Sequence, residues 1–397
     1  MKYKLILLLI VAIDVAILLF EASRLSISSS EAYFLYNQDG FLHTLVTLSL
    51  NFFGESDFAL RLPFLLLHLG SIFLLYLVSK DYLKDERNRF WLILTFVLLP
   101  GVVSSAVVVS HAGFLIFGLL LFLYIDRHFP IYVSSLLLLF FAWVDGAFSY
   151  LFLGLFIYAL VKKEREYALY TLFLYGLSIY LHGFVIHGYP RGHFLDTIGL
   201  YSAIFTPVIF VYLFYALYRR YLTGQKDKIW YIATTALLFS LFTSFRQKIA
   251  VEEFAPYLII ALPLAAQTFS SSYRVRLKEH RKGYKTIFIA AFVLLTINTI
   301  VVFFNKELYL LLDNPKKNFI YEMDIAKELA EKLQERNISC VSTDEKMQRR
   351  LRFYGVKKCE ENLLKVLPLD ASQESNVTIS YKGITLYRAN VTKLNKK

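Results

Sequence analysis

Long apolar segments alternate with short polar ones over the first three quarters of the chain. Eleven of these segments are candidates for membrane spans, and most have about 15–20 residues, the length that crosses a bilayer as a helix. They are residues 4–20, 59–78, 90–109, 112–125, 131–145, 146–161, 167–185, 201–218, 229–244, 254–270 and 286–304. The pattern predicts an α-helical polytopic membrane protein with about eleven transmembrane helices.

Composition supports this fold class. Hydrophobic residues make up 57% of the 397 positions, whereas soluble domains average about 45–50%. The formal net charge of +12 would suggest nucleic acid as a partner of a soluble protein. Here the positive residues gather at the ends of apolar segments, which indicates membrane topology. We expect no nucleic-acid partner.

The distribution of basic residues predicts the orientation. With a cytoplasmic N-terminus, the inner segments carry Lys2, Lys4, Lys80, Lys84, Arg87, Arg89, Arg127, Lys162, Lys163, Arg165, Arg219, Arg220, Lys226, Lys228, Arg274, Arg276, Lys278, Arg281, Lys282 and Lys285. The outer loops carry only Arg24, Arg61, Arg191, Arg246 and Lys248. Cytoplasmic loops are enriched in Lys and Arg. We therefore expect a multi-pass protein of the cytoplasmic membrane with an extracytoplasmic C-terminus. This count requires 131–145 and 146–161 to be separate spans.

The last quarter of the chain has the pattern of a small globular domain. Helices are predicted at 322–336 and 345–354, a strand at 338–342, and a hairpin at 376–388 with its turn at Lys382-Gly383. We therefore divide the chain into a transmembrane domain, residues 1–304, and an extracytoplasmic α/β domain, residues 305–397.

The two cysteines, Cys340 and Cys359, both lie in this C-terminal domain. Their spacing fits no metal site. In an oxidising compartment a disulfide is expected, with the Cα atoms within about 7 Å. Two buried, unbridged thiols are the alternative.

The first predicted outer loop, residues 21–58, is too long for a simple connector. It carries the acids Glu21, Glu31, Asp39, Glu55 and Asp57 together with His43. Its apolar stretch 45–53 predicts short amphipathic helices on the membrane surface. An acidic loop of this kind can supply a general base, and a solvated connector is the alternative interpretation.

Two stretches of this region resemble a known family. Residues 24–36 (RLSISSSEAYFLY) and 54–63 (GESDFALRLP) are similar to the start of the GT-C membrane glycosyltransferases, which include the protein O-mannosyltransferases and the lipid A aminoarabinose transferases. Glu31-Ala32-Tyr33 matches an Asp-Glu-Ala-Tyr-Tyr-like motif, and Gly54, Ser56, Arg61, Leu62 and Pro63 match a Gly-x-Ser-x-x-x-x-Arg-Leu-Pro motif. The basic, Tyr- and Pro-bearing stretch 246–263 is similar to a further family segment.

The resemblance implies a function. Such enzymes take a sugar from a polyprenyl-phosphate carrier and transfer it to a glycan, lipid or protein acceptor at the outer face, so the carrier and membrane lipid are the expected partners. A single in-line displacement would invert the anomeric centre. The resemblance implies no cofactor, and it leaves open whether the reaction requires a divalent metal ion. A non-catalytic protein that binds or transports a lipid-linked sugar is the alternative.

The chain also departs from the family pattern. Ser30 stands where the leading Asp, commonly the catalytic base, is usual. Ser110-His111-Ala112 replaces a Pro-Asp-Ala motif, and Asp145 replaces a Lys. The charges at the expected site therefore differ from the family pattern, with His111 as a basic candidate and Asp145 as an acidic one.

These considerations assign candidate roles. Glu31 and Asp145 are the candidate catalytic carboxylates, because a positioned carboxylate can take the acceptor's proton. For Asp145, a structural cap at the end of its span is the alternative role. Arg246, Lys248, Arg191 and Arg61 are the candidate ligands of the donor phosphate, with snorkelling to the membrane interface as the alternative role for such cations. The candidate site-lining residues are His111, His43, Asp39, Tyr33, His187, His193 and Tyr257. Asp14, midway along the first span, is expected to face protein or to be protonated.

Overall fold

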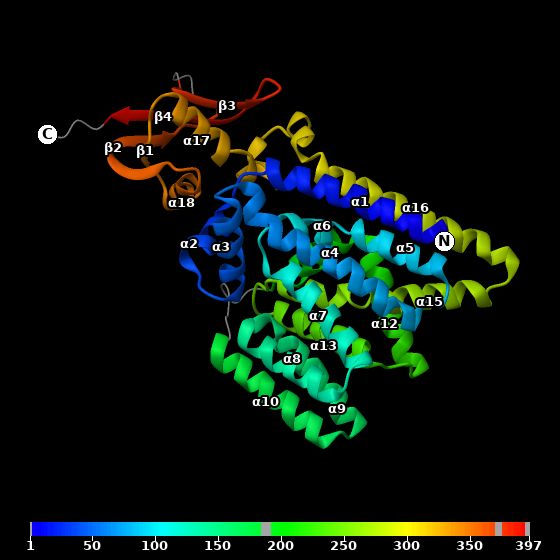
Figure 1. Cartoon of the computed structure of the whole chain (residues 1–397). Helices are drawn as coiled ribbons and strands as arrows, with labels where there is room; N and C mark the ends of the chain where they lie inside the picture. Colours follow the sequence, from blue (N-terminus) through cyan, green and yellow to red (C-terminus); the bar gives the residue numbers. More distant parts are fainter. Residues whose placement is uncertain (1, 184–191, 370–374, 394–397) are drawn as a thin grey trace. The chain divides into compact units, whose positions relative to one another are not determined.

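The computed structural model describes residues 2–183, 192–369 and 375–393, and the chain forms two compact units (Figure 1). The helical unit comprises residues 1–18 and 64–299, and the second unit comprises residues 19–63 and 300–397. The first loop thus belongs to the same unit as the C-terminal region. The division at 304/305 stays a prediction.

The helical unit is built from helices, and short turns join most of those that the structure describes as consecutive. Two of them, α1 (Lys2–Arg24) and α4 (Asp57–Tyr82), also contribute residues to the second unit. The others are α5 (Glu86–Val97), α6 (Pro100–Val107), α7 (His111–His128), α8 (Ile131–Val144), the 3-10 turn η1 (Gly146–Phe148), α9 (Ser149–Lys162), α10 (Arg165–His182), α11 (Phe194–Phe205), α12 (Pro207–Thr223), α13 (Lys228–Ser244), α14 (Val251–Ile259), α15 (Leu262–Val275) and α16 (Lys278–Phe303).

Among the described residues, four helices are long and apolar enough to cross a membrane: α1, α4, α7 and α16. Three of the predicted spans are instead pairs of helices bent at a short break. These pairs are α5–α6 (59°), α11–α12 (103°) and α14–α15 (42°), and counting each as one span gives up to seven. The predicted number of eleven spans stays a prediction.

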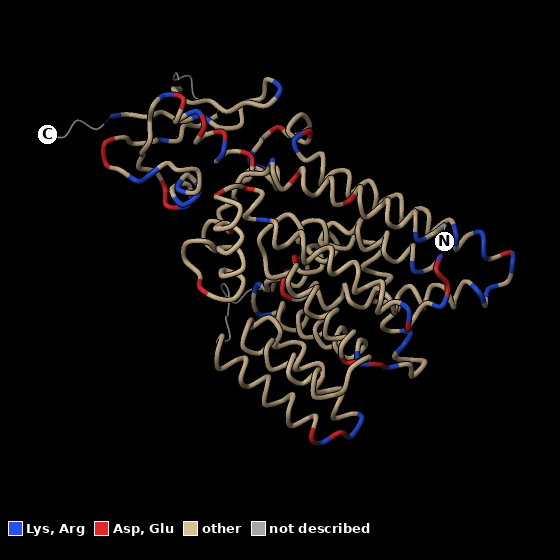
Figure 2. Tube along the Cα trace, viewed as in Figure 1, with Lys and Arg blue, Asp and Glu red and all other residues tan. Residues whose placement is uncertain are grey.

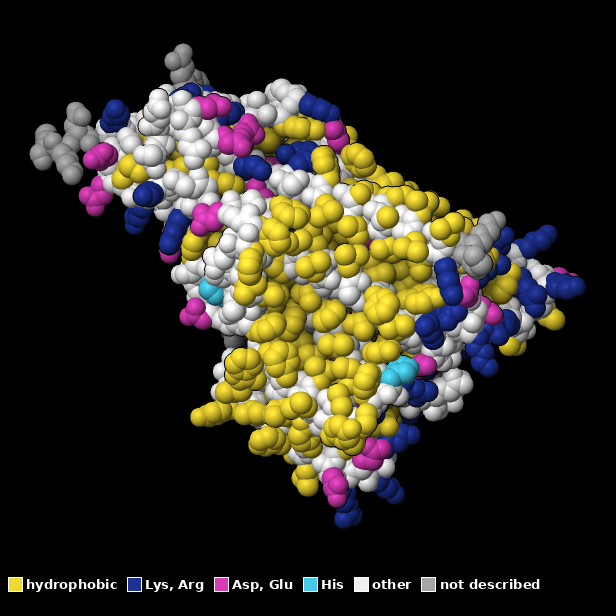
Figure 3. All heavy atoms as spheres, viewed as in Figure 1, with side chains coloured by type: hydrophobic (Ala, Val, Ile, Leu, Met, Phe, Trp, Pro, Cys, Tyr) yellow, Lys and Arg dark blue, Asp and Glu magenta, His cyan; other side chains and the backbone are white. Residues whose placement is uncertain are grey.

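The surface of the helical unit is strongly apolar. Leu5 and Leu8 on α1 and Ile287 on α16 are among many large hydrophobic side chains that are more than half exposed, and such side chains cover much of the visible face (Figure 3). A water-soluble monomer rarely exposes an apolar surface of this extent. The helices are those of a multi-pass membrane protein.

One end of the helical unit collects the segments that the basic residues mark as inner. The ion pairs that join them are Lys4–Glu86 (3.5 Å), Arg274–Asp85 (3.4 Å), Arg127–Asp81 (3.6 Å) and Lys228–Asp126 (2.7 Å). Lys228 also lies over the rings of Tyr158 and Tyr167, which flank segment 162–165. Figure 2 shows basic residues gathered near the N-terminus and at the loop between α15 and α16. We call this the basic end.

The basic end also shows how the chain runs through α8 and α9. The segments before α8 and after α9 both contact Lys228, so the chain leaves the basic end along α8 and returns to it along α9. The backbone of Asp145, between them, is extended (φ −156°, ψ 131°), which interrupts the helix at the far end. The two are separate helices, as the basic-residue count required.

The second unit combines the first loop with a small sheet. The loop forms α2 (Ser29–Asn37) and α3 (Phe41–Phe53). The C-terminal part contains η2 (Asn305–Leu310), η3 (Pro315–Lys317), η4 (Tyr321–Asp324), α17 (Ala326–Glu335), β1 (Cys340–Ser342), α18 (Glu345–Phe353), β2 (Lys357–Val366), β3 (Val377–Tyr381) and β4 (Ile384–Lys393). The sheet order is β1-β2-β4-β3, with β1 parallel to β2 and the other pairs antiparallel.

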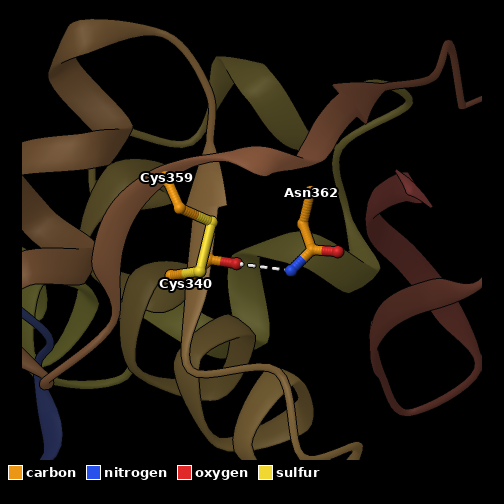
Figure 4. Close-up of a disulfide and its surroundings, with 3 residues drawn as sticks. All are labelled: Cys340, Cys359 and Asn362. Atoms are coloured by element: carbon orange, nitrogen blue, oxygen red, sulfur yellow. Dashed lines mark hydrogen bonds between the residues drawn. A yellow bond between two sulfur atoms is a disulfide. The ribbon is translucent and has the colours of Figure 1, made fainter. Parts of the chain in front are cut away.

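Most sequence predictions for this region are confirmed. The hairpin turns at Lys382 and Gly383, both with positive φ (47° and 87°), the geometry of a tight hairpin turn. Cys340 and Cys359 form a disulfide with a Cα–Cα distance of 5.5 Å (Figure 4). The Asn362 side-chain amide donates to the Cys340 carbonyl (3.0 Å) beside it. The first helix is shorter than predicted, because residues 321–324 form a separate 3-10 turn.

Candidate functional site

Two polar clusters contain the two candidate catalytic residues, one in each unit. The loop cluster lies in the second unit and consists of Ser28, Glu31 and Arg61. Ser28 caps α2: its hydroxyl accepts from the Glu31 N–H (3.1 Å), and the Glu31 carboxylate accepts from the Ser28 N–H (2.8 Å). This is a capping box, which satisfies two helix-end donors at once.

Arg61 fixes the loop through all five of its N–H donors. Nη1 donates to the carbonyls of Ala22 (3.0 Å) and Leu25 (2.5 Å). Nη2 donates to the Ser26 carbonyl (3.0 Å) and to Glu31 Oε2 (3.0 Å), and Nε donates to Glu31 Oε1 (3.2 Å). The two motifs that carry the GT-C resemblance therefore meet in one forked ion pair.

The pair is closed to solvent, since the side chains of Glu31 and Arg61 are both 0% exposed. Both carboxylate oxygens and all the guanidinium donors are engaged within the chain. A base must reach its substrate and a phosphate ligand must reach the phosphate. The base role of Glu31 and the phosphate role of Arg61 stay predictions, and each requires this pair to open.

The C-terminal part of the second unit holds the same loop from α18 and α17. The Tyr354 hydroxyl donates to Asp57 (2.6 Å) and accepts from the Ile27 N–H (2.8 Å). Lys327 pairs with Asp57 (2.9 Å), and Arg350 donates to the Ile27 carbonyl (3.0 Å). Burial, together with the Asp57 carboxylate, raises the pKa of Tyr354. Burial lowers the pKa of Arg350.

The dyad cluster lies in the helical unit and centres on His111 and Asp145. His111 Nδ1 is 2.5 Å from Asp145 Oδ2. The other carboxylate oxygen accepts from the Ala147 N–H (2.9 Å), and Tyr257 donates to the Ala147 carbonyl (2.6 Å). Tyr257 therefore supports the turn that carries Asp145. The His111 side chain is 39% exposed and the Asp145 side chain 8%.

The dyad cluster lies far from the basic end. His111 begins α7, whose other end carries Asp126 and Arg127, and 18 helical residues extend about 27 Å. Glu252 and Glu253, in the first turn of α14, are close enough to act electrostatically on His111. The end of the unit that the topology predicts as outer is therefore acidic around the partly exposed imidazole of His111.

Arg246 and Lys248 lie in the linker between α13 and α14, and both are exposed. Since α13 starts at the basic end with Lys228, this linker lies at the same end as the dyad cluster. His193 lies beside the start of this linker, because its backbone N–H donates to the carbonyl of Ser244 at the end of α13 (2.8 Å). The His193 ring pairs with Asp196 (3.3 Å). His187 and Arg191 lie outside the described residues.

The other candidate residues of the loop lie within the second unit. Tyr33 is about half exposed, with the guanidinium of Arg349 over its ring (5.1 Å). A His43 ring nitrogen contacts the Leu35 carbonyl (3.1 Å). Asp39 is exposed in the turn between α2 and α3.

Asp14 pairs with His68 (2.9 Å) inside the helical unit. Both side chains are buried, and the His68 ring stacks on Phe96. Asp14 faces protein, as expected for an acid in a membrane span. Among the described residues, no group of three or more His, Cys, Asp or Glu is placed to hold a metal ion.

Sequence reasoning missed several residues that organise these clusters. The Ser28-x-x-Glu31 spacing is a readable capping-box signal, and Glu253 lies inside the stretch 246–263 already singled out. Tyr354 had no local signal, because its partner Ile27 is 327 positions away.

Comparison with known proteins places the fold. No protein-family profile and no curated protein matches the sequence. Two solved structures of ArnT from Cupriavidus metallidurans are similar, each with a TM-score of 0.56 and 13% identity. The apo structure matches over 98% of both chains, and the structure bound to undecaprenyl phosphate matches over 88% of this chain and 74% of that one. ArnT is a lipid A aminoarabinose transferase of the GT-C class, so the fold expected from the resemblance is confirmed.

Proposed function

We propose that this protein is a GT-C-type glycosyltransferase that moves a sugar, or a sugar-like group, from a polyprenyl-phosphate carrier to an acceptor at the outer face of the membrane. The observation that carries the proposal is the likeness to ArnT over nearly the whole of both chains, with undecaprenyl phosphate bound to one of the two ArnT structures. The proposed inversion follows from a single displacement at the anomeric carbon.

The reaction needs two kinds of group. A base must take the proton of the attacking hydroxyl, and cations must stabilise the phosphate as it leaves. Exposed Arg246 and Lys248, in a linker at the dyad end, are the proposed phosphate ligands. Arg191 is proposed with them from its sequence position.

A second candidate function is a non-catalytic protein that binds or transports a lipid-linked sugar. Two observations favour it: Ser30 replaces the usual acid of the motif, and the neighbouring Glu31 is enclosed by Arg61.

The test uses the purified full chain in detergent. Binding of undecaprenyl phosphate is measured for the wild type and for Arg246→Gln/Lys248→Gln. Loss of one or two charge-assisted hydrogen bonds, each worth about 1.5–3 kcal/mol, should weaken binding by tenfold or more. The matched control is Arg274→Gln/Lys278→Gln, which removes two cations at the basic end and should bind like the wild type.

Transfer is then measured from a panel of undecaprenyl-phosphate-linked hexoses and aminopentoses to lipid, glycan and peptide acceptors. Transfer supports the enzyme, and binding without transfer from any donor supports the second candidate. A wild type that does not bind undecaprenyl phosphate refutes both.

A further inference from the structure

The dyad cluster has the geometry of an acid–base pair that a substrate can reach. The carboxylate of Asp145 is nearly enclosed and is fixed by the Ala147 N–H, whereas the imidazole that it holds is partly exposed. Nδ1 of the ring contacts Asp145, and the partly exposed ring is the part of the pair that a substrate hydroxyl would approach.

We propose that His111 is the catalytic base of this site and that Asp145 is its positioning residue. The proposal rests on the transferase function proposed above. It replaces the loop acid expected from the family pattern, because Ser30 has no comparable basicity and Glu31 is enclosed by Arg61.

The contact with Asp145 determines which nitrogen acts. Nδ1 lies 2.5 Å from Asp145 Oδ2, so Nδ1 carries a proton and donates to the carboxylate. In a neutral ring Nε2 is then the proton acceptor. A buried carboxylate that holds a histidine in one tautomer is the arrangement that activates hydroxyl nucleophiles in unrelated hydrolases.

The proton and electron pairs balance in one displacement. An acceptor hydroxyl oxygen bonds to the anomeric carbon of the donor sugar, and its proton passes to His111 Nε2. The bond between that carbon and the phosphate oxygen breaks, and the electron pair leaves with the lipid phosphate. The imidazolium of His111 then returns the proton to solvent.

The surroundings of the dyad suit this step. Among the described residues, the charged groups that act on His111 include Asp145, at the end of α8, and Glu252 and Glu253 on α14. His182, at the end of α10, acts electrostatically on Asp145. The carboxylates stabilise the positive charge that develops on His111, and they disfavour a phosphate beside it. The donor phosphate therefore belongs with Arg246 and Lys248.

The test compares His111→Ala and Asp145→Asn with the wild type, using the same donor panel and the full chain. Loss of a general base should lower kcat of His111→Ala by about 10²–10⁴-fold, with undecaprenyl phosphate binding unchanged and with partial rescue by added imidazole. Asp145→Asn should lower kcat and move the acid limb of the pH–rate profile to lower pH, because the imidazole loses its negative partner. His128→Gln, an exposed histidine at the other end of α7, is the control and should match the wild type.

The outcomes separate the two proposals. If the wild type transfers nothing from any donor, the transferase proposal fails and the base assignment fails with it. If the wild type transfers and His111→Ala keeps its rate, only the base assignment is overturned. His111→Asn is used if the alanine variant does not fold, and a wild-type rate in that variant overturns the assignment in the same way.

Discussion

Replacing Arg61 by methionine should open the first loop. Methionine is of similar length but has no donors, so Glu31 loses both of its bonds to the guanidinium. The carbonyls of Ala22, Leu25 and Ser26 lose their Arg61 donors as well. Methionine largely keeps the hydrophobic contacts of the aliphatic part of the Arg61 side chain. The effect of the substitution therefore reports the loss of the polar contacts.

The expected cost follows from burial. Removing one partner of a buried ion pair costs about 3–5 kcal/mol, and each 1.36 kcal/mol is a factor of ten. Amide hydrogens of residues 22–31 that exchange by local opening should then exchange roughly 10²–10⁴-fold faster. Glu31→Gln/Arg61→Met should recover part of this loss, because glutamine is neutral and can still complete the capping box.

Native-state hydrogen exchange read by mass spectrometry measures the effect, with peptides that cover residues 19–63. Arg24→Met is the matched control, because the Arg24–Glu21 pair is 3.7 Å long and the Arg24 side chain is 40% exposed. Surface pairs contribute about 0–1 kcal/mol. Wild-type protection in Arg61→Met, or strict additivity in the double variant, would refute the reasoning.

Four further predictions concern the second unit and the topology. Cys340→Ser/Cys359→Ser should lower the unfolding temperature in thermal scans, because a cross-link between residues 19 positions apart stabilises by about 3 kcal/mol; an unchanged temperature contradicts this. Tyr354→Phe removes the hydrogen bond from the Tyr354 hydroxyl to Asp57 (2.6 Å) and should destabilise the loop by about 1.5–3 kcal/mol. The amide hydrogens of residues 26–31 should then exchange faster, and exchange at the wild-type rate would contradict this prediction. Burial and the Asp57 carboxylate raise the pKa of Tyr354 in the folded unit above its unfolded pKa near 10. Tyr354 therefore stabilises the folded unit below about pH 10, and this stabilisation should be lost as the pH rises through the folded pKa. A reporter that works only outside the cytoplasm should be active when fused after residue 397. Activity there of a reporter that works only in the cytoplasm would refute the predicted orientation.

The sequence predicted those features that depend on local pattern. Apolar blocks located the helices, and the spacing of basic residues required the break at Asp145. The Lys382-Gly383 turn has two residues of positive φ, which a short sequence can specify. The bends in α5–α6 and α11–α12 were not predicted, because hydropathy reports how apolar a segment is and not its direction.

The candidate site was only partly predictable, for a physical reason. Glu31 and Arg61 were both identified as functional candidates, but a sequence does not show that their charges satisfy each other. Their pairing depends on the return of the chain from α3 into α4. His111 and Asp145 were identified separately, from two departures in the family pattern, and only the fold of α7 against the end of α8 brings them into contact.

The five-donor arrangement around Arg61 has a consequence for how such chains are recognised. Lysine has three donors on one rotating group and cannot replace a planar fork, so the first loop depends on arginine at this position. A relative that had lost transfer activity would still need the glutamate of the Glu-Ala-Tyr segment and the arginine of the Arg-Leu-Pro segment to hold that loop. Finding both segments in a new sequence therefore identifies an architecture, and a search for working enzymes has to look at the residues that remain open to substrate.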